Sequence, residues 1–367
     1  MSVLVTAVVS TFNASRFIRR RLENLISQTL YRQGGLEIIV IDSASRENEA
    51  EIVREFVSRY KQIKYLRTER RETVYCSWNR AIELSRGRYF INANTDDLFQ
   101  ANGLEDLADA LESRLEYDAV YGDWYYQAEN DLQVTQKPDS KRLYRYPGFY
   151  PPLLFYTQPT SHALMIRQEI FTQIGQFNPE FEVFGDREWV FRFAVAGCRA
   201  LHFSSPVGIY CKRQDSLERS RAETGRREFN GLLTRYSEPE IFVRLHRFDG
   251  AGLVTDGKKL SELYARTGEL GIHFASISNG RDCLPQQTKL FLRRALALDP
   301  DNFSAANNMA VVAALAGQFV FAEKTLRRCF AISEAERKEY QDYNFDALSR
   351  RAKCLGDFHW YLSVEQP

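Results

Sequence analysis

Apolar and polar positions follow two alternating patterns along the first half of the chain. Continuous apolar or β-branched runs, typical of strands buried on both faces, lie at residues 3–10, 38–41, 63–67 and 89–93. Amphipathic stretches that predict helices lie between them, at residues 17–29, 45–60 and 73–85. This succession predicts an α/β fold with a mostly parallel sheet flanked by helices.

Beyond residue 100 the pattern becomes less regular. Residues 104–111 and a stretch that opens at Asp186 predict helices, whereas residues 119–126 and 201–203 predict strands. The proline-rich stretch 137–159 predicts a loop. After the last of these strands only helical patterns remain, so the second part of the chain is expected to be all-α.

The C-terminal third contains one internal repeat. Residues 292–298 (LRRALAL) recur as residues 326–332 (LRRCFAI), an offset of 34 residues, which is the period of a tetratricopeptide repeat. Two unrelated Arg-rich amphipathic helices are the alternative. The patterns together predict an α/β domain over residues 1–225, a connecting segment over 226–255 and a helical, tetratricopeptide-like domain over 256–367.

Composition narrows the function only a little. The 49 basic and 48 acidic residues leave a net charge of +1, which argues against bulk binding of nucleic acid. The six cysteines are scattered without metal-ligand or redox spacing, as in reduced thiols of a cytosolic protein. The N-terminal run lacks a basic leader and no run has the length of a membrane span. We therefore expect a cytoplasmic protein.

Two adjacent carboxylates follow the fourth predicted strand, in the stretch from Asn94 to Asp97. Open α/β sheets bind their ligands at the carboxyl ends of their strands. Asp96 and Asp97 therefore lie where paired carboxylates would suit a hard divalent cation that also holds phosphate oxygens. A turn with two solvated acids is the alternative, because Asp is a common turn residue.

Four segments in order along the chain resemble the family 2 glycosyltransferases. The segments are VTAVVSTFN at residues 5–13, IVIDSAS at 39–45, NTDD at 94–97 and FGDREW at 184–189. They resemble the family's opening strand, its second strand and acidic turn, its Asp-x-Asp metal motif and its Glu-Asp motif at a helix start. The resemblance covers about the first 210 residues and does not extend to the helical part.

The resemblance implies a GT-A fold, which is Rossmann-like, and an inverting transfer of a sugar from a nucleotide-diphosphate donor to an acceptor hydroxyl. It departs from the family pattern at three positions. Asn94 and Gly185 stand where acids are usual, and Ser43 replaces a second acid after Asp42. A catalytically inactive relative that binds a nucleotide or a glycan and acts as a scaffold is therefore the alternative function.

The chemistry of this transfer assigns roles to the candidate residues. Mn²⁺ or Mg²⁺ would neutralise the leaving diphosphate, with Asp97 as direct ligand and Asp96 as second ligand or donor contact. Arginine and lysine side chains are expected to share this work or to be solvated surface charges; the candidates are Arg70, Arg71, Lys212 and Arg213. The other residues expected to bind the nucleotide-sugar are Ser10, Thr11, Asn13, Asp42, Ser43 and Asn94. Helix capping by Asn13 and turn formation by Asp42 are the alternatives.

Asp186 is the expected general base. It opens a helix, and the helix N-terminus stabilises its anionic form and so predicts a weak base. A simple N-cap is the alternative role. Glu188 is expected to orient the acceptor or to bond Arg192 one turn along the helix.

The acceptor is expected to be a glycan, a glycolipid, or a peptide or protein, and a UDP-sugar is the favoured donor. His162 and Trp124 are the acceptor-side candidates, and packing in the core is the alternative for both. The proline-led segment 151–156 offers a peripheral contact with the inner face of a membrane. The helical domain is expected to bind a protein partner or a second copy of the chain.

Overall fold

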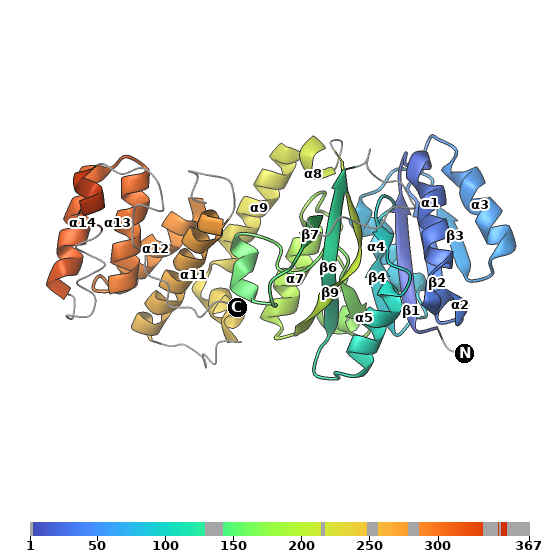
Figure 1. Ribbon diagram of the computed structural model, residues 1–367, viewed down its shortest axis with the longest axis horizontal. Coiled ribbons are helices and arrows are strands. Elements are labelled where there is room, and N and C mark those ends of the chain that lie inside the picture. The colour runs from blue at the N-terminus through green and yellow to red at the C-terminus, as the bar shows by residue number, and fades with distance from the viewer. Residues whose placement is uncertain are drawn as a thin grey trace. The chain divides into compact units, whose positions relative to one another are not determined.

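The computed structural model describes residues 3–128, 142–213, 217–247, 256–277, 286–332, 344 and 346–350. The chain divides into two compact units (Figure 1). The first comprises residues 1–149 and 158–234, and the second comprises residues 150–157 and 235–367. This division differs from the predicted boundaries, because a short segment from the middle of the chain belongs to the second unit. Residues 129–141 of the predicted loop and 248–255 of the predicted connection lie outside the described residues.

The first unit is built around four parallel strands that match the four predicted apolar runs. They are β1 (Val5–Thr11), β2 (Leu36–Asp42), β3 (Ile63–Arg67) and β4 (Tyr89–Asn92). Their spatial order is β3-β2-β1-β4, and every residue of β2 is buried. Burial on both faces explains why these strands read as continuous apolar runs in the sequence.

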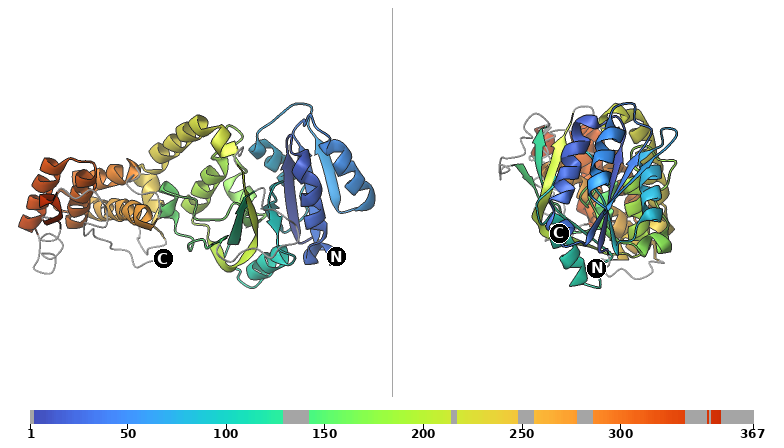
Figure 2. Two further views of the ribbon diagram at one scale, coloured as in Figure 1. Left: turned by 45° about the horizontal axis from the view of Figure 1, so that its top comes forward. Right: turned by 90° about the vertical axis from the view of Figure 1, so that its right-hand side faces the viewer.

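Helices connect these strands and cover the sheet (Figure 2). They are α1 (Ser15–Ile26), α2 (Thr29–Arg32), α3 (Glu49–Arg59) and α4 (Val74–Leu84). The chain steps from β1 to β2 to β3 in one direction and then returns past β1 to β4. Because such crossovers are right-handed, α1 and α3 lie on one face and α4 on the other. The reversal between β1 and β4 is the point where open α/β sheets bind ligands.

The rest of the sheet makes it mixed rather than mostly parallel. The added strands are β5 (Leu98–Phe99), β6 (Ala119–Ala128), β7 (Leu143–Tyr144), β8 (Met165–Arg167) and β9 (Ala200–Lys212). The order continues from β4 through β8, β6 and β9 to β5, and β8 runs antiparallel to both of its neighbours. β9 is far longer than the predicted strand at 201–203 because it continues through Pro206, where the β6–β9 register shifts around Asp123.

The remaining helices of the first unit lie, in chain order, between or after the strands of the second half of the sheet. They are α5 (Gly103–Glu112), α6 (Ile170–Ile174), α7 (Gly185–Val195), α8 (Leu217–Ser220) and α9 (Ala222–Tyr236), of which α9 runs to the boundary between the units. The α/β prediction for this part of the chain is confirmed.

The second unit is helical throughout its described residues. Its elements are η3 (Pro151–Phe155), α10 (Pro239–Leu245), α11 (Gly257–Ile277), α12 (Gln286–Leu298), α13 (Phe303–Leu315) and α14 (Phe319–Ile332). Helices α11 to α14 follow one another as neighbours (Figure 1). The two copies of the internal repeat lie on α12 and α14.

The proline-led segment 151–156 belongs to the core of this helical unit. The ring of Phe155 lies 4.8 Å from that of Phe291 and 5.7 Å from that of Phe242. The Tyr156 hydroxyl donates to the Thr267 carbonyl at 2.6 Å. The prediction that this segment contacts a membrane is therefore wrong, since its apolar side chains are already buried. Among the described helices we find none with the length and apolar character needed to cross a bilayer.

Candidate active site

The acid turn, residues 94–97, lies beside the carboxyl end of β1, as the sequence predicted. The Thr95 hydroxyl donates to the Ser10 carbonyl at 3.2 Å, and the Ala93 amide donates to the Val8 carbonyl at 2.7 Å. The turn therefore occupies the sheet edge at the point where the strand order reverses.

A buried arginine from α1 holds the backbone of this turn. Arg21 is fully buried and donates to the Asp97 carbonyl at 3.0 Å and to the Ala93 carbonyl at 3.3 Å. Burial lowers the pKa of Arg21 to about 10, so the group still carries its charge at neutral pH. Arg21 is not among the residues predicted for the site, although it lies one helical turn from Phe17 and from Leu25 on the apolar face of α1.

Asp97 is 2% exposed and both of its carboxylate oxygens accept hydrogen bonds from the protein. The Cys211 amide donates to Oδ1 at 3.0 Å, and the Asn94 side-chain amide donates to Oδ2 at 3.2 Å. Burial raises the pKa of Asp97 to about 6. Asp97 is thus built into the turn rather than presented to solvent.

His162 packs against Asp97 instead of standing free on an acceptor side. Its Nε2 lies 3.4 Å from Asp97 Oδ2, and its ring lies 4.2 Å from the ring of Trp124 and 4.7 Å from that of Tyr210. Burial lowers the pKa of His162 to about 3, so the imidazole is neutral. Trp124 is completely buried. This burial favours core packing, the alternative given for Trp124, over its predicted contact with an acceptor.

Asp96 is the more accessible acid of the pair, with 23% of its side chain exposed. Its Oδ2 accepts from Arg213 Nη1 at 3.0 Å, and its backbone carbonyl accepts from Arg20 Nη2 at 3.2 Å. Burial and the neighbouring Asp97 charge raise the pKa of Asp96 to about 6. Arg213 also lies over the Phe17 ring, 5.0 Å from its centroid.

The turns after β1 and β2 are locked by their own side chains. Asn13 and Ala44 have positive φ angles of 48° and 53°, a conformation that L-residues rarely adopt outside functional or tightly held turns. The Asn13 carbonyl oxygen Oδ1 accepts the Arg46 amide at 2.9 Å, and the Ser45 hydroxyl accepts the Asn13 amide at 3.2 Å. Asn13 therefore links the two turns instead of capping α1.

Asp42 and Ser43 are buried within the second of these turns. Asp42 Oδ2 accepts from the Tyr65 hydroxyl at 2.7 Å and from Arg67 at 3.0 Å, while Oδ1 accepts the Ser45 amide at 2.8 Å. The Ser43 hydroxyl accepts the Glu72 amide at 2.7 Å. These contacts favour the turn-forming alternative for Asp42 over direct contact with a nucleotide base.

The remaining residues of β1 that were expected to bind the nucleotide-sugar make fewer contacts with other protein groups. Thr11 is 3% exposed, and its hydroxyl has no hydrogen-bond partner among the described residues. Ser10 is half-buried next to it. Arg71 is exposed and its guanidinium lies 4.1 Å from the centroid of the Phe12 ring, at the start of the same loop.

Asp186 lies in the first turn of α7, beside the first turn of α4. Its Oδ1 lies 3.3 Å from the Tyr75 hydroxyl and accepts the Arg187 amide at 2.8 Å. Because α4 begins just after the carboxyl end of β3, Asp186 lies at the same edge of the sheet as the acid turn. Burial raises the pKa of Asp186, opposite in direction to the lowering that a helix N-terminus alone would cause.

The glycine at position 185 is explained by the close approach of the Tyr75 ring to the start of α7. A Cβ atom at this position would lie 2.6 Å from the Tyr75 ring, closer than any side chain tolerates. The departure from the family's Glu-Asp pattern is therefore coupled to the tyrosine that supports Asp186.

Glu188 has the structural role that the sequence analysis held as its alternative. It is 2% exposed, and both carboxylate oxygens accept from Arg192 Nε, at 2.9 and 3.0 Å. Arg192 in turn donates to the Ile174 carbonyl at 2.6 Å. An acid held in such a buried pair is not available to orient an acceptor, so the catalytic assignment of Glu188 is not supported.

Glu228, on α9, is a second residue that was not predicted for the site. Its carboxylate accepts the backbone amides of Glu182, Val183 and Phe184 at 2.7, 3.0 and 2.9 Å. The residues that carry these three amides form the loop that leads directly to Asp186. Glu228 lies in a strongly charged stretch of the chain, where no sequence pattern distinguished it from solvated acids.

Comparison with known proteins assigns this unit to a family. Residues 6–175 match the family described as "Glycosyl transferase family 2". The chain carries a family 2 glycosyltransferase domain. Over the described residues its architecture is a mixed sheet of nine strands flanked by helices, in line with the α/β fold that the sequence predicted.

Individual relatives of this glycosyltransferase are distant. "Glycosyltransferase GlyG" of Streptococcus pneumoniae is 22% identical over 232 residues, covering 60% of this chain and 74% of the relative. "PGL/p-HBAD biosynthesis glycosyltransferase" of Mycobacterium bovis is 22% identical, covering 52% and 69%. The structure of S. aureus TarS 1-349 in complex with UDP-GlcNAc has a TM-score of 0.48 at 15% identity, covering 97% of this chain and 89% of TarS 1-349.

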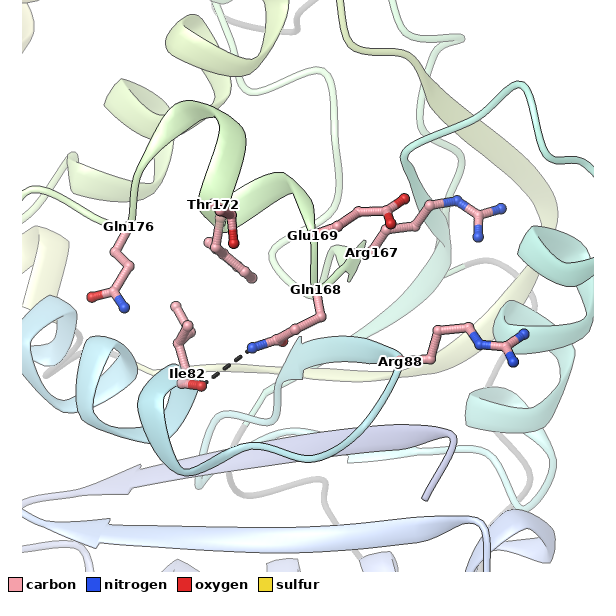
Figure 3. Close-up of a pocket in the computed structure, with 8 residues that line it drawn as sticks. Ile82, Arg88, Arg167, Gln168, Glu169, Thr172 and Gln176 are labelled. Atoms are coloured by element: carbon pink, nitrogen blue, oxygen red, sulfur yellow. Dashed lines mark hydrogen bonds between the residues drawn. The ribbon is translucent and has the colours of Figure 1, made fainter. Parts of the chain in front are cut away.

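A separate pocket of about 520 Å³ lies at the other end of β4 (Figure 3). Arg88 precedes β4 and Arg167 pairs with its first residue, whereas the acid turn follows its last. Arg88 forms an ion pair with Glu112 at 2.6 Å, and Arg167 donates to the Leu111 carbonyl at 2.7 Å. In the glycosyltransferase domain this pocket is therefore remote from the candidate active site.

The donor set at the acid turn does not fit the divalent ion that we expected the glycosyltransferase to hold. Both oxygens of Asp97 accept protein N–H groups, and Asp96 is paired with Arg213. The Asn94 amide donates to Asp97, and its oxygen faces the Asn92 amide at 3.5 Å. Within the described part of the chain, no group of three His, Cys, Asp or Glu side chains that could hold a metal ion is found.

Proposed function

We propose that this protein transfers a sugar from a nucleoside-diphosphate donor, with a UDP-sugar favoured, to an acceptor hydroxyl with inversion. The observation that carries the proposal is the placement of Asp186. It lies at the same sheet edge as the acid turn, with one oxygen 3.3 Å from the Tyr75 hydroxyl, which also donates to the Val183 carbonyl at 2.6 Å, and with a pKa raised by burial. Membership in the glycosyltransferase family supports the reaction class.

Asp186 acts as the general base in this proposal. The acceptor oxygen forms a bond to the anomeric carbon, while the bond from that carbon to the diphosphate oxygen breaks. The acceptor proton passes to Asp186, and the electron pair of the broken bond leaves with the nucleoside diphosphate. Asp186 Oδ2 accepts no hydrogen bond from the described residues and is the oxygen that receives the proton. A raised pKa brings the acid closer to working pH and makes it a better base.

Ser10, Thr11 and the acid turn hold the donor in this proposal. The unpartnered Thr11 hydroxyl supports a polar ligand at the end of β1, since a buried hydroxyl without a partner is costly. The exposed Arg71 can reach the same loop. The sequence predicted that Mn²⁺ or Mg²⁺ would neutralise the diphosphate as a Lewis acid. Because the donor set does not fit that ion, we assign no step to it.

A glycan, a glycolipid or a protein supplies the acceptor hydroxyl. With Trp124 buried, Tyr144 and Tyr126, which stack on each other at 5.2 Å, are our candidates for aromatic contact with a sugar ring. Tyr144 is 41% exposed. Tyr126 also lies 4.9 Å from Tyr210, which packs on His162 beside the acid turn. These contacts support an acceptor path that runs from the tyrosines toward the site.

A panel of nucleotide-sugars tests the proposal. The full chain should consume one of them, releasing the nucleoside diphosphate, and Asp186→Asn should abolish the release while binding of the nucleotide persists. Binding without consumption of any donor, in the presence of a range of glycan acceptors, would instead favour the scaffold alternative.

The tetratricopeptide-like helical unit binds a protein partner or a second copy of the chain in this proposal. Val320 and Phe321 on α14 support it, with 85% and 52% exposure. Truncation before α11 is a poor test, because it would uncover Phe155 in the same unit. The double variant Val320→Asp, Phe321→Ser leaves that core intact. It should change the oligomeric state or acceptor use, and an unchanged result in both measurements would refute the role.

A further inference from the structure

Three arginine side chains surround the two acids of the acid turn. Arg213 pairs with the Asp96 carboxylate at 3.0 Å. Arg20 and Arg21 donate to the backbone carbonyls of Asp96 and Asp97 at 3.2 and 3.0 Å. Among the described residues, three guanidinium groups and two carboxylates therefore meet at the acid turn, one guanidinium on a carboxylate and two on backbone carbonyls.

This charge balance differs from that of an ion site. Carboxylates that hold Mg²⁺ or Mn²⁺ offer the ion uncompensated negative charge and free lone pairs. Here an entering divalent ion would raise the local charge further and would have to displace Arg213 from Asp96. A nucleoside diphosphate has the opposite requirement, because its phosphate oxygens need cationic donors.

Arg213 is placed to meet that requirement. Its side chain is 19% exposed, in contrast to the fully buried Arg21. It follows directly after β9, where the Cys211 amide is anchored to Asp97. The planar guanidinium also rests over the Phe17 ring at 5.0 Å. Contacts on two sides orient a group whose fork of N–H donors matches phosphate geometry.

We propose that Arg213 is a catalytic residue that takes the place of a divalent ion, binding the diphosphate of the donor and stabilising its charge as it leaves. Asp96 is then a positioning residue that orients Arg213, and transfer proceeds without a metal. Preorganised cationic donors at a developing phosphate charge are an effective means of catalysis. This inference rests on the proposed function, since it concerns the leaving group of that reaction.

Nucleotide binding by the full chain tests the inference directly. The full chain is titrated by calorimetry with UDP and with uridine, and in parallel with GDP and with guanosine. Each titration is done once in about 1 mM EDTA and once in about 1 mM MnCl₂. We expect the diphosphate to bind with about the same affinity in both buffers. Arg213→Ala should weaken diphosphate binding by roughly 10- to 100-fold and leave nucleoside binding unchanged.

Two further variants separate the role of the charge from folding. Arg213→Lys should recover part of the affinity, whereas the control Arg59→Ala, on an exposed arginine of α3, should have no effect. Asp96→Asn discriminates most sharply. If Asp96 only orients Arg213, Asp96→Asn keeps its diphosphate affinity in EDTA within about fivefold of that of the unchanged chain. If Asp96 is a metal ligand, the variant loses the part of diphosphate binding that depends on Mn²⁺.

The outcomes distinguish the two proposals. Diphosphate binding or turnover that disappears in EDTA and returns with Mn²⁺ would overturn the inference and leave the proposed function standing. Unchanged diphosphate affinity in Arg213→Ala would overturn it as well. A chain that binds none of the nucleotides in either buffer would overturn the proposed function together with the inference.

Discussion

The acid turn and the start of α7 use the same residue type in opposite ways. Burial raises the pKa of Asp96, Asp97 and Asp186 alike. At the acid turn the carboxylates are surrounded by guanidinium groups and backbone amides. At the start of α7, one oxygen of Asp186 accepts the Arg187 amide and lies 3.3 Å from the Tyr75 hydroxyl. The charges at the acid turn therefore suit it to holding guanidinium groups beside the leaving diphosphate. The surroundings of Asp186 suit it to accepting a proton.

Asp186→Asn gives the largest expected effect and tests whether proton transfer occurs at Asp186 while the diphosphate binds at the acid turn. The amide cannot accept the acceptor proton, so kcat should fall roughly a thousandfold. Nucleotide affinity should stay within about twofold, because the diphosphate is bound at the other cluster. Steady-state kinetics and calorimetry measure the two quantities. A variant with normal turnover would remove Asp186 from the chemistry.

Arg21→Met tests whether the acid turn depends on its buried cation. Removing the guanidinium leaves the Asp97 and Ala93 carbonyls without their donor and two buried acids less compensated. The free energy of unfolding should fall by roughly 3 kcal/mol, as measured by denaturant unfolding. Arg19→Met is the matched control on the same helix, since its partner Glu55 is exposed, and it should change little. Equal stability of both variants would contradict the role of Arg21.

Glu228→Gln tests whether the α7 cluster is positioned from α9. The neutral amide weakens the hold on the three backbone amides before Asp186. We expect kcat to fall about tenfold while the donor KM stays unchanged. The exposed Glu223 on the same helix provides the control variant, Glu223→Gln. A change in KM without a change in kcat would place Glu228 at the donor instead.

Tyr75→Phe gives the smallest expected effect and sharpens the proton-transfer side of the comparison. The hydroxyl stabilises the charged form of Asp186 and so lowers its pKa. Its removal should raise that pKa further and move the acid limb of the kcat profile to higher pH, by about half a unit. Tyr65→Phe, which loses a bond to Asp42, should leave the limb in place. A shift to lower pH would show that the hydroxyl acts in another way.

Several site residues were recognisable before the structure was known. The acid turn and Asp186 stood out because acids that follow an apolar strand, or open an amphipathic helix, are marked by the pattern around them. Ser10 and Thr11 were marked in the same way by the end of the first buried run. Each of these signals is local in the chain.

The roles within the site were not recognisable in this way. Trp124 and Glu188 looked like functional residues, yet one is buried in the sheet and the other is paired with Arg192. Arg21 and Glu228 looked like ordinary charges, yet each holds a backbone segment from a distant element. Burial decided the role of Trp124, and partners at long sequence separations decided the roles of Arg21 and Glu228. For Glu188 the structure selected the pairing with Arg192, one helical turn away, that the sequence had offered as an alternative.

By itself, the sequence determined the order of strands and helices in the first half, the helical character of the second, and the position of the acids at strand and helix ends. These follow from local periodicity, because strand and helix repeat with different spacing. Only the tertiary structure decided that segment 151–156 joins the helical unit and that Arg213 meets Asp96 across 117 positions. Such pairings depend on packing between distant parts of the chain, which leaves no local pattern.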